Sequence, residues 1–191
     1  MAIFSSALAA NSSASAGSLP LTEAAVAYPY KISTLLYCFN EADDILLLKR
    51  AQQPNQGLWS PAGGKLHTEE GESPYACACR EGFEEMQVSM TPADLHLTGI
   101  ISEFGYQGAA HWLMFLFEVK LPINEVPPPN REGTFQFFRQ EEVADLAVPE
   151  SDRASIWPWF WQHRGGFFAG HCHCHEGGRM DWLLEESRPK T

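Results

Sequence analysis

The chain has 191 residues, and its 24 acidic and 13 basic side chains give a net charge of -11 at pH 7. Nucleic-acid-binding proteins normally cluster Lys and Arg on one face, and no such cluster is visible here, so we expect no nucleic-acid partner. No apolar run approaches the ~18 residues of a membrane-spanning helix, so we expect no membrane partner. Hydrophobic residues make up 45% of the chain, enough for the core of one domain.

The five cysteines are an odd number, and no secretion signal is visible, so we expect reduced thiols and a cytoplasmic location. Residues 1–27 are rich in Ala and Ser and lack Lys and Arg, which predicts a flexible tail rather than a signal peptide. The folded domain is predicted to cover residues 28–187, followed by a short tail at 188–191.

Runs of β-branched, aromatic and aliphatic residues predict strands at 31–39, 45–49, 95–104, 111–120, 133–138, 167–175 and 179–185. Helices are predicted at 74–86, 141–146 and 151–163, the first with Ser73 as N-cap and Pro74 at its first position. Between the second strand and the first helix, a loop at 52–65 is rich in Gly and Pro. These elements predict an α/β (α+β) fold in which a mixed β-sheet lies between helices.

The first helix carries three carboxylates on one side. At ~100° per residue, Glu81, Glu84 and Glu85 lie at i, i+3 and i+4 and are direct neighbours. Such carboxylates repel one another unless they bind a cation, and oxygen ligands suit Mg²⁺ or Mn²⁺. A solvated acidic face is the alternative. The opposite arc is apolar and is predicted to pack on the sheet: Ala76, Cys79, Phe83 and Met86.

The loop before this helix ends in Gly63, Gly64 and Lys65. The two glycines allow the backbone to approach a phosphate closely, and the Lys65 ammonium can contact that phosphate. From Gly64 to Val88 the chain resembles the signature of the Nudix family, Gly-x5-Glu-x7-Arg-Glu-U-x-Glu-Glu-x-Gly-U, where U is aliphatic. The charged positions match as Glu72, Arg80, Glu81, Glu84 and Glu85. The resemblance implies that the last three bind Mg²⁺ (or Mn²⁺) and that Arg80 orients a carboxylate.

Three positions depart from the signature. Seven residues, instead of five, separate Gly64 from Glu72, which leaves the role of Glu72 open. Gly82 stands where the family has an aliphatic residue, at a cost in helix stability. Gln87 replaces the glycine that ends the helix.

Two further segments are similar to MutT-like nucleotide diphosphatases, which include enzymes for oxidised purine nucleotides. The loop at 58–64 resembles their Trp-containing loop and nominates Trp59 and Ser60 as substrate-binding residues, together with the two glycines and Lys65. Glu132, followed by Phe137 and Phe138, resembles their Glu-x4-Trp-Phe segment. There the Glu is an extra metal ligand or base; a surface glutamate is the alternative.

Oxidised-guanine specificity is less well supported. Those enzymes carry an Asn where this chain has Ser60, and their Trp-Pro-Asp-Asp segment is matched only loosely at 148–152. A single hydroxyl offers less than an amide, which has a donor pair and an acceptor. One tryptophan, either Trp59, Trp112 or a member of the aromatic cluster at 157–161, is expected to stack on the base, while the rest of that cluster packs in the core.

The predicted function is Mg²⁺-dependent hydrolysis of a diphosphate bond in nucleoside di- or triphosphates, with 8-oxo-dGTP among the candidate substrates. Two alternatives stay open: a Nudix hydrolase of dinucleoside polyphosphates, sugar nucleotides or isoprenoid diphosphates, and a Nudix module that senses a nucleotide without cleaving it. The partner is expected to be a small molecule, and a homodimer is left open. On a strand, His171, His173 and His175 face away from Cys172 and Cys174, so we interpret this run as a strand with buried thiols rather than a zinc site.

Overall fold

The computed structural model describes residues 28–53 and 55–190, so the predicted tail at 1–27 lies outside the described residues. The strands are β1 (Tyr30–Phe39), β2 (Ile45–Arg50), β3 (Trp59–Ser60), β4 (Leu95–Tyr106), β5 (Ala110–Val119), β6 (Gly133–Phe138), β7 (Phe167–Cys174) and β8 (Met180–Arg188). The α-helices are α1 (Pro74–Met86), α2 (Gln140–Val143) and α3 (Trp157–His163). Short helical turns are η1 (Thr68–Glu70), η2 (Pro92–Asp94), η3 (Asp152–Ile156) and η4 (Glu176–Gly178). Within the described part, no helix has the length and apolar character needed to cross a membrane.

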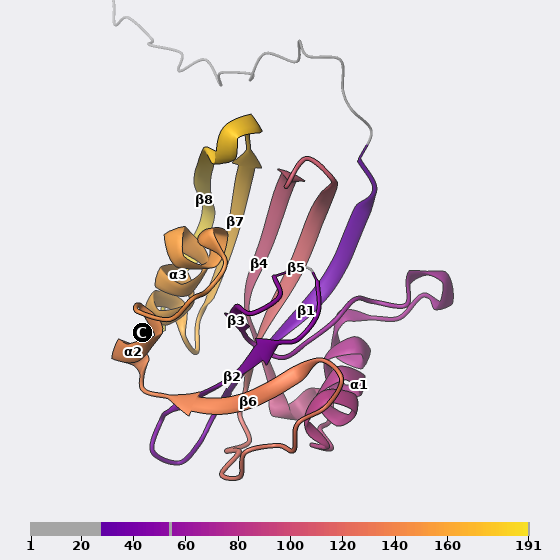
Figure 1. Ribbon diagram of the computed structural model, residues 1–191, viewed down its shortest axis with the longest axis vertical. Coiled ribbons are helices and arrows are strands. Elements are labelled where there is room, and N and C mark those ends of the chain that lie inside the picture. Colours follow the sequence, from indigo (N-terminus) through magenta and orange to yellow (C-terminus); the bar gives the residue numbers. More distant parts are fainter. Residues whose placement is uncertain (1–27, 54, 191) are drawn as a thin grey trace, which may run out of the picture.

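The strands form one mixed sheet of eight, ordered β3-β2-β1-β5-β4-β7-β8, with β6 paired to β2 (Figure 1). β1 runs parallel to β5 and β4 parallel to β7, and the other neighbours are antiparallel. The predicted hairpin of β1 and β2 pairs only beside its turn, at Cys38↔Leu46 and Phe39↔Ile45. Beyond that point the two strands diverge, because β1 pairs with β5 while β2 pairs with β6 and β3.

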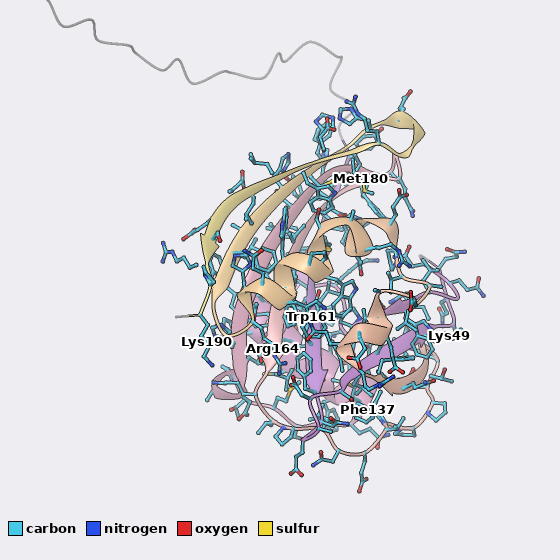
Figure 2. All side chains as sticks on the ribbon, turned by 90° about the vertical axis from the view of Figure 1, so that its left-hand side faces the viewer. Lys49, Phe137, Trp161, Arg164, Met180 and Lys190 are labelled. Atoms are coloured by element: carbon cyan, nitrogen blue, oxygen red, sulfur yellow. The ribbon has the colours of Figure 1, made fainter. Side chains whose placement is uncertain are left out.

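The sheet separates two hydrophobic cores. Because side chains alternate along a strand, Leu36 and Cys38 of β1 pack with Ala78 and Met86 of α1. The intervening Tyr37 and Phe39 pack on the other side with residues of α3. Seen from that side, α3 lies across the strands, with Trp161 on it (Figure 2). The predicted arrangement of a mixed sheet between helices is confirmed.

α1 begins as predicted but turns a different face to the sheet. The hydroxyl of Ser73 accepts a hydrogen bond from the Ala76 N–H at 3.2 Å, and Pro74 occupies the first turn. The predicted apolar arc is confirmed for Met86, which is buried, and for Cys79, which packs against the same core. It is wrong for Phe83, which is 59% exposed, and for Ala76, which is also exposed. The buried residues are Cys77, Ala78, Gly82, Glu85 and Met86. Glu85 lies on this buried side, where its carboxylate accepts a hydrogen bond from the Gly63 N–H.

The segment predicted as a helix at 151–163 is helical throughout, but it is not a regular α-helix. Its first part, η3, is wound as a π-helix, in which the Trp157 N–H donates to the carbonyl of Asp152. α3 then begins with Pro158 in its first turn. Proline has no N–H to donate to the preceding turn, and a wider π turn is one way to accommodate it. Ser151, directly before η3, and Asp152, its first residue, are both buried.

Candidate active site

The carboxylate side of α1 faces the glycine loop. Oε2 of Glu85 accepts a hydrogen bond from the Gly63 N–H at 2.9 Å. A Cβ on Gly64 would lie 2.2 Å from Oε1 of Glu81, and a Cβ on Gly63, whose φ is +137°, would lie 2.2 Å from the carbonyl oxygen of Thr34. Gly63 is therefore required for the loop to lie against β1, and Gly64 leaves the space that the Glu81 carboxylate occupies.

Arg80 organises the polar surface of this helix. Its Nε and Nη2 donate to the two carboxylate oxygens of Glu72 at 2.9 and 3.0 Å, and this contact is the main reason that the pKa of Glu72 falls to about 2. Nη1 donates to Glu81 at 2.6 Å and to Glu84 at 3.3 Å, while Nη2 also reaches the carbonyl of Lys65 at 3.1 Å. One guanidinium therefore fixes three carboxylates and the end of the glycine loop.

The longer loop keeps Glu72 in place. The turn η1 lies on the exposed side of the loop, and Gly71 closes it in the left-handed conformation with φ of 68°. Glu72 then accepts the His67 N–H at 2.8 Å and contacts Arg80. The extra length is accommodated as an exposed turn, so the question left open for Glu72 is answered: it is the ion-pair partner of Arg80.

The other two departures from the signature have local explanations. A Cβ on Gly82 would lie 2.0 Å from Cε of Met90, so the methionine fills the space where an aliphatic side chain of the helix would pack. Gln87 ends the helix with φ of 60°, and its N–H donates to the carbonyls of Gly82 and Phe83. It therefore adopts the left-handed conformation that usually selects glycine.

Glu132 is brought towards α1 by Asn130. Nδ2 of Asn130 donates to the Glu85 carbonyl at 2.7 Å, and its Oδ1 accepts the Glu132 N–H at 2.8 Å. The charge of Glu132 contributes to the raised pKa of Glu85. Sequence reasoning found Glu132 but missed Asn130. An Asn after three prolines is a turn signal, but nothing local links it to α1.

The donor chemistry fits a hard divalent cation. Burial raises the pKa of Glu85 to about 7, and the charges of Glu81 and Glu132 add to the effect. Burial likewise raises the pKa of Glu81, against the hydrogen bond from Arg80. As now arranged, no three His, Cys, Asp or Glu side chains within residues 28–53 and 55–190 converge as metal ligands. Buried carboxylates that repel one another are nevertheless the charge arrangement that Mg²⁺ or Mn²⁺ neutralises.

A cavity of about 290 Å³ opens beside this loop. Among the predicted residues, Ser60, Gly63, Gly64, Lys65 and Glu132 line it. The cavity lining distinguishes two of the tryptophans that were candidates for base stacking. Trp112 lines the cavity, whereas Trp59 packs edge-to-face on Phe138, at a centroid distance of 4.7 Å, and is absent from the described lining.

The same cavity contains two acidic residues: Glu103, which sequence reasoning missed, and Asp152, from the loosely matched segment at 148–152. Glu103 and Asp152 line it together with Tyr106 and Ser151. Burial raises the pKa of Glu103 to about 8, with the charges of Cys174 and Asp152 adding, while a hydrogen bond with Ser151 lowers it. Burial also raises the pKa of Asp152 to about 7. The available signal was a Glu two residues after the buried Ile101, at an inward-facing position of the strand.

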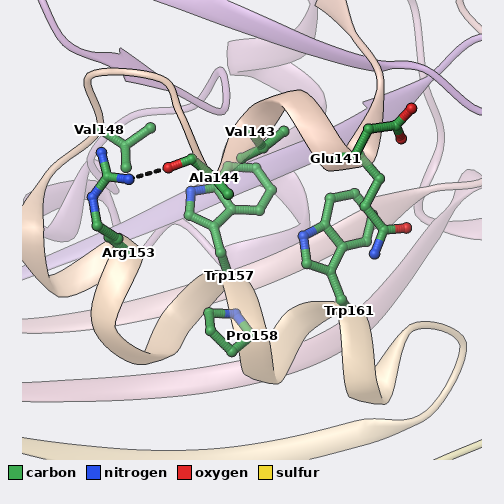
Figure 3. Close-up of a pocket in the computed structure, with 9 residues that line it drawn as sticks. Glu141, Val143, Ala144, Val148, Arg153, Trp157, Pro158 and Trp161 are labelled. Atoms are coloured by element: carbon green, nitrogen blue, oxygen red, sulfur yellow. Dashed lines mark hydrogen bonds between the residues drawn. The ribbon is translucent and has the colours of Figure 1, made fainter.

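A larger hollow of about 610 Å³ lies between α2 and α3 (Figure 3). Trp157 and Trp161 stack beside it with centroids 5.7 Å apart, and Arg153 donates to the carbonyls of Ala144 and Leu146. Its described lining includes one carboxylate, Glu141, and neither the glycine loop nor a residue of α1. The smaller cavity is therefore the candidate active site.

The histidine and cysteine run is the predicted strand, β7. Cys172 and Cys174 share a face, with their sulfurs 3.7 Å apart, and Cys172 is buried. On the other face, Nδ1 of His171 lies 2.7 Å from the Ser102 hydroxyl, and His173 stacks on His175 at 4.2 Å. The predicted alternation of the two residue types is confirmed.

A sequence model of the NUDIX domain matches residues 29–160. The fold is similar to that of a MutT protein from Bacillus halodurans, with a TM-score of 0.65 and 24% identity over 81% of this chain and 97% of that one. A MutT protein from Methanosarcina mazei Go1 gives 0.58 and 23% over 72% and 94%. The NUDIX domain of Shewanella oneidensis NrtR, solved with ADP ribose, gives 0.54 and 14% over 70% and 86%. At these identities the structural likeness concerns the fold.

The match of the domain model, together with the carboxylate helix and its glycine loop, defines the class of protein: the chain belongs to the Nudix family. It is a Nudix hydrolase that acts on phosphorus-containing anhydrides.

Proposed function

We propose that this protein is a Mg²⁺-dependent diphosphatase of nucleoside di- and triphosphates, with Glu81, Glu84 and Glu85 as metal ligands and Glu132 as a further ligand or base. The observation that carries the proposal is the contact of buried, mutually repelling carboxylates with the Gly63–Gly64 loop, beside a cavity of about 290 Å³. Mg²⁺, when bound, neutralises charge on phosphoryl oxygens and favours ionisation of water.

The residues of the chain have separate tasks in this reaction. The two glycines and Lys65 line the cavity, where the backbone can lie beside a diphosphate and Lys65 supplies a positive charge. Arg80 holds Glu81 and Glu84 in position. A water oxygen forms a bond to phosphorus, the bridging P–O bond breaks, and the water proton passes to a carboxylate, for which Glu132 is the candidate. A nucleoside triphosphate would then yield a monophosphate and diphosphate.

Substitution of single ligands tests the proposal. Glu84→Gln and Glu85→Gln each remove a charge while keeping the shape, and the amide oxygen at 85 can still accept the Gly63 N–H. We expect each variant to lose at least ~10²-fold in turnover of nucleoside triphosphates with Mg²⁺, because the metal loses an anionic ligand. Glu69→Gln, an exposed substitution in η1, is the matched control and should keep wild-type turnover.

Circular dichroism of each variant would show that the fold is retained. Near-normal turnover in both ligand variants would contradict the metal-site assignment. The substrate panel should contain dGTP, 8-oxo-dGTP, ADP-ribose and a dinucleoside tetraphosphate, with chromatographic separation of the nucleotide products as the readout. Cleavage of the last two but of neither triphosphate would place the substrate in the alternative class of sugar nucleotides and dinucleoside polyphosphates.

A further inference from the structure

Two cysteines of β7 lie side by side and have no task in the proposed hydrolysis. Cys172 and Cys174 share one face of the strand, and their sulfur atoms are 3.7 Å apart. We propose that this pair is a reversible oxidation site, at which hydrogen peroxide converts the two thiols to a disulfide within one strand. The inference does not rest on the proposed function, because it involves neither a metal ligand nor a residue that contacts the diphosphate.

The first argument is the separation of the two sulfurs. A disulfide bond is about 2.05 Å long, so the sulfurs have to approach by about 1.6 Å. Two residues along a strand place their Cα atoms about 6.6 Å apart, which lies near the upper end of the range that a disulfide spans. The buried thiols of Cys38 and Cys77 contact Met86 and Thr34 instead.

The second argument is that the end of β7 can make the movement that remains. Cys174 is the last residue of the strand, and the described register with β4 ends one residue earlier, at His173. Beyond it, η4 contains Gly177 and Gly178, and a Cβ on either glycine would meet no described atom within 4 Å. Cys174 can therefore approach Cys172 at the cost of its own pairing with β8, while the rest of the ladder stays in place.

The third argument is that the two thiols differ in reactivity, since the thiolate is the form that attacks a peroxide. A hydrogen bond from the Cys172 thiol lowers the pKa of Cys174, whereas the same contact and burial raise the pKa of Cys172. Cys174 is half-buried, whereas Cys172 is fully buried. An accessible thiol of lowered pKa beside a second cysteine is typical of redox-sensitive sites. Cys174 is therefore the attacking thiol, and Cys172 is the one that closes the disulfide.

The oxidation takes two steps. The Cys174 thiolate attacks one oxygen of hydrogen peroxide, the O–O bond breaks, hydroxide leaves, and the sulfur becomes a sulfenic acid. The Cys172 sulfur then attacks the sulfur of the sulfenic acid, the S–O bond breaks, and the thiol proton leaves with the oxygen as water. Two electrons pass from the thiols to the peroxide. Because one residue separates the cysteines, the disulfide is strained, and strained disulfides are readily reduced by dithiols.

The pair lies behind the wall of the candidate cavity. Cys172 is the register partner of Glu103 on β4. Burial raises the pKa of Glu103, which lines the cavity, and the charge of Cys174 adds to that effect. A disulfide carries no charge, so its formation removes this contribution. The oxidation state of the two cysteines is therefore linked electrostatically to the cavity.

Mass spectrometry of the wild type tests the inference without any substitution. Trypsin cleaves after Arg164 and Arg179, so one peptide of residues 165–179 contains both cysteines and no third one. The folded protein would be treated with hydrogen peroxide, blocked with iodoacetamide in denaturant and digested. We expect this peptide to lose both alkyl groups and the mass of two hydrogens. It should regain both alkylation sites when dithiothreitol is applied before blocking.

Variants of each cysteine test the order of the steps. Cys172→Ser should leave a sulfenic acid on Cys174 that dimedone labels, whereas Cys174→Ser should leave Cys172 unlabelled at the same dose of peroxide. Cys79→Ser, which removes a half-buried thiol of α1, is the matched control and should form the disulfide as the wild type does. A peptide of 165–179 that stays doubly alkylated after peroxide treatment of the wild type, or that is joined to a different peptide, would overturn the inference.

Discussion

Replacing Glu103 with Gln should make the protein more stable at alkaline pH, with a gain that grows from pH 5 to pH 8. The carboxyl group is buried, and its pKa in the folded protein is raised from 4.5 to about 8. A raised pKa means that the folded state binds the proton more tightly than the unfolded chain does. This contribution to stability is fully present below pH 4.5 and is lost as the pH rises through 8.

The size of the effect follows from the shift. At about 1.4 kcal/mol for each pKa unit, and with allowance for relaxation around the charge, we expect the variant to gain about 2–4 kcal/mol on the wild type between pH 5 and pH 8. For a domain of this size, that corresponds to a change of about 5–15 °C in the difference between their melting temperatures. The amide preserves the shape of the side chain, so packing changes should cancel.

Calorimetric melting of both proteins at several pH values provides the measurement. Asp152 from η3, Cys174 from β7 and Tyr106 from β4 interact electrostatically with Glu103. The difference between the two curves therefore reports the titration of Glu103 together with the change that its removal causes in these neighbours. Glu125→Gln should give a curve parallel to that of the wild type. A stability difference that stays constant from pH 5 to pH 9 would refute the reasoning, since it would mean that Glu103 is no harder to ionise in the folded protein than in the unfolded chain.

Three further predictions concern the metal, the base and the helix end. Millimolar Mg²⁺ should raise the melting temperature through binding to the carboxylates of α1, by RT ln(1 + [L]/Kd), and the rise should disappear in Glu85→Gln; an equal rise in that variant would argue against this site. The ratio of kcat/KM for 8-oxo-dGTP and dGTP should stay below about 100, because the lone hydroxyl of Ser60 reads the oxidised edge poorly, and a ratio above roughly 10³ would show that another residue reads it. Gln87→Gly should raise the free energy of unfolding by about 0.5–1 kcal/mol in chemical denaturation, because glycine relieves the left-handed backbone, and a loss of stability would mean that the Gln side chain makes a larger contribution.

The predictions that the structure confirms rest on local information. A capping serine followed by proline defines the start of α1, and the 3.6-residue repeat places its glutamates on one side, whatever the rest of the fold does. The strand at β7 was predictable for a similar reason, since alternation along the strand separates His171 from Cys172. Such features need only neighbouring residues.

The parts that could not be predicted depend on contacts between distant segments. The buried face of α1 was predicted only in part: hydrophobicity correctly favoured Met86 and wrongly favoured Phe83, whereas Glu85, which bonds to Gly63, is buried. The meeting of Glu103 with Asp152 requires the order of the strands and the π turn before Pro158. The bridge from Asn130 to α1 spans 45 positions in the sequence, which no local pattern encodes.

The ion pair of Arg80 with Glu72 has a consequence for how relatives of this chain are recognised. A search pattern that counts residues between the glycine and the first glutamate would reject this chain at Glu72, although the two side chains meet at 2.9 and 3.0 Å. The quantity that must be preserved is a distance in space, and the number of residues that supply it is free to vary where the turn faces solvent. Loops of other lengths should therefore be tolerated at η1 in engineered variants, provided that a carboxylate still returns to the guanidinium.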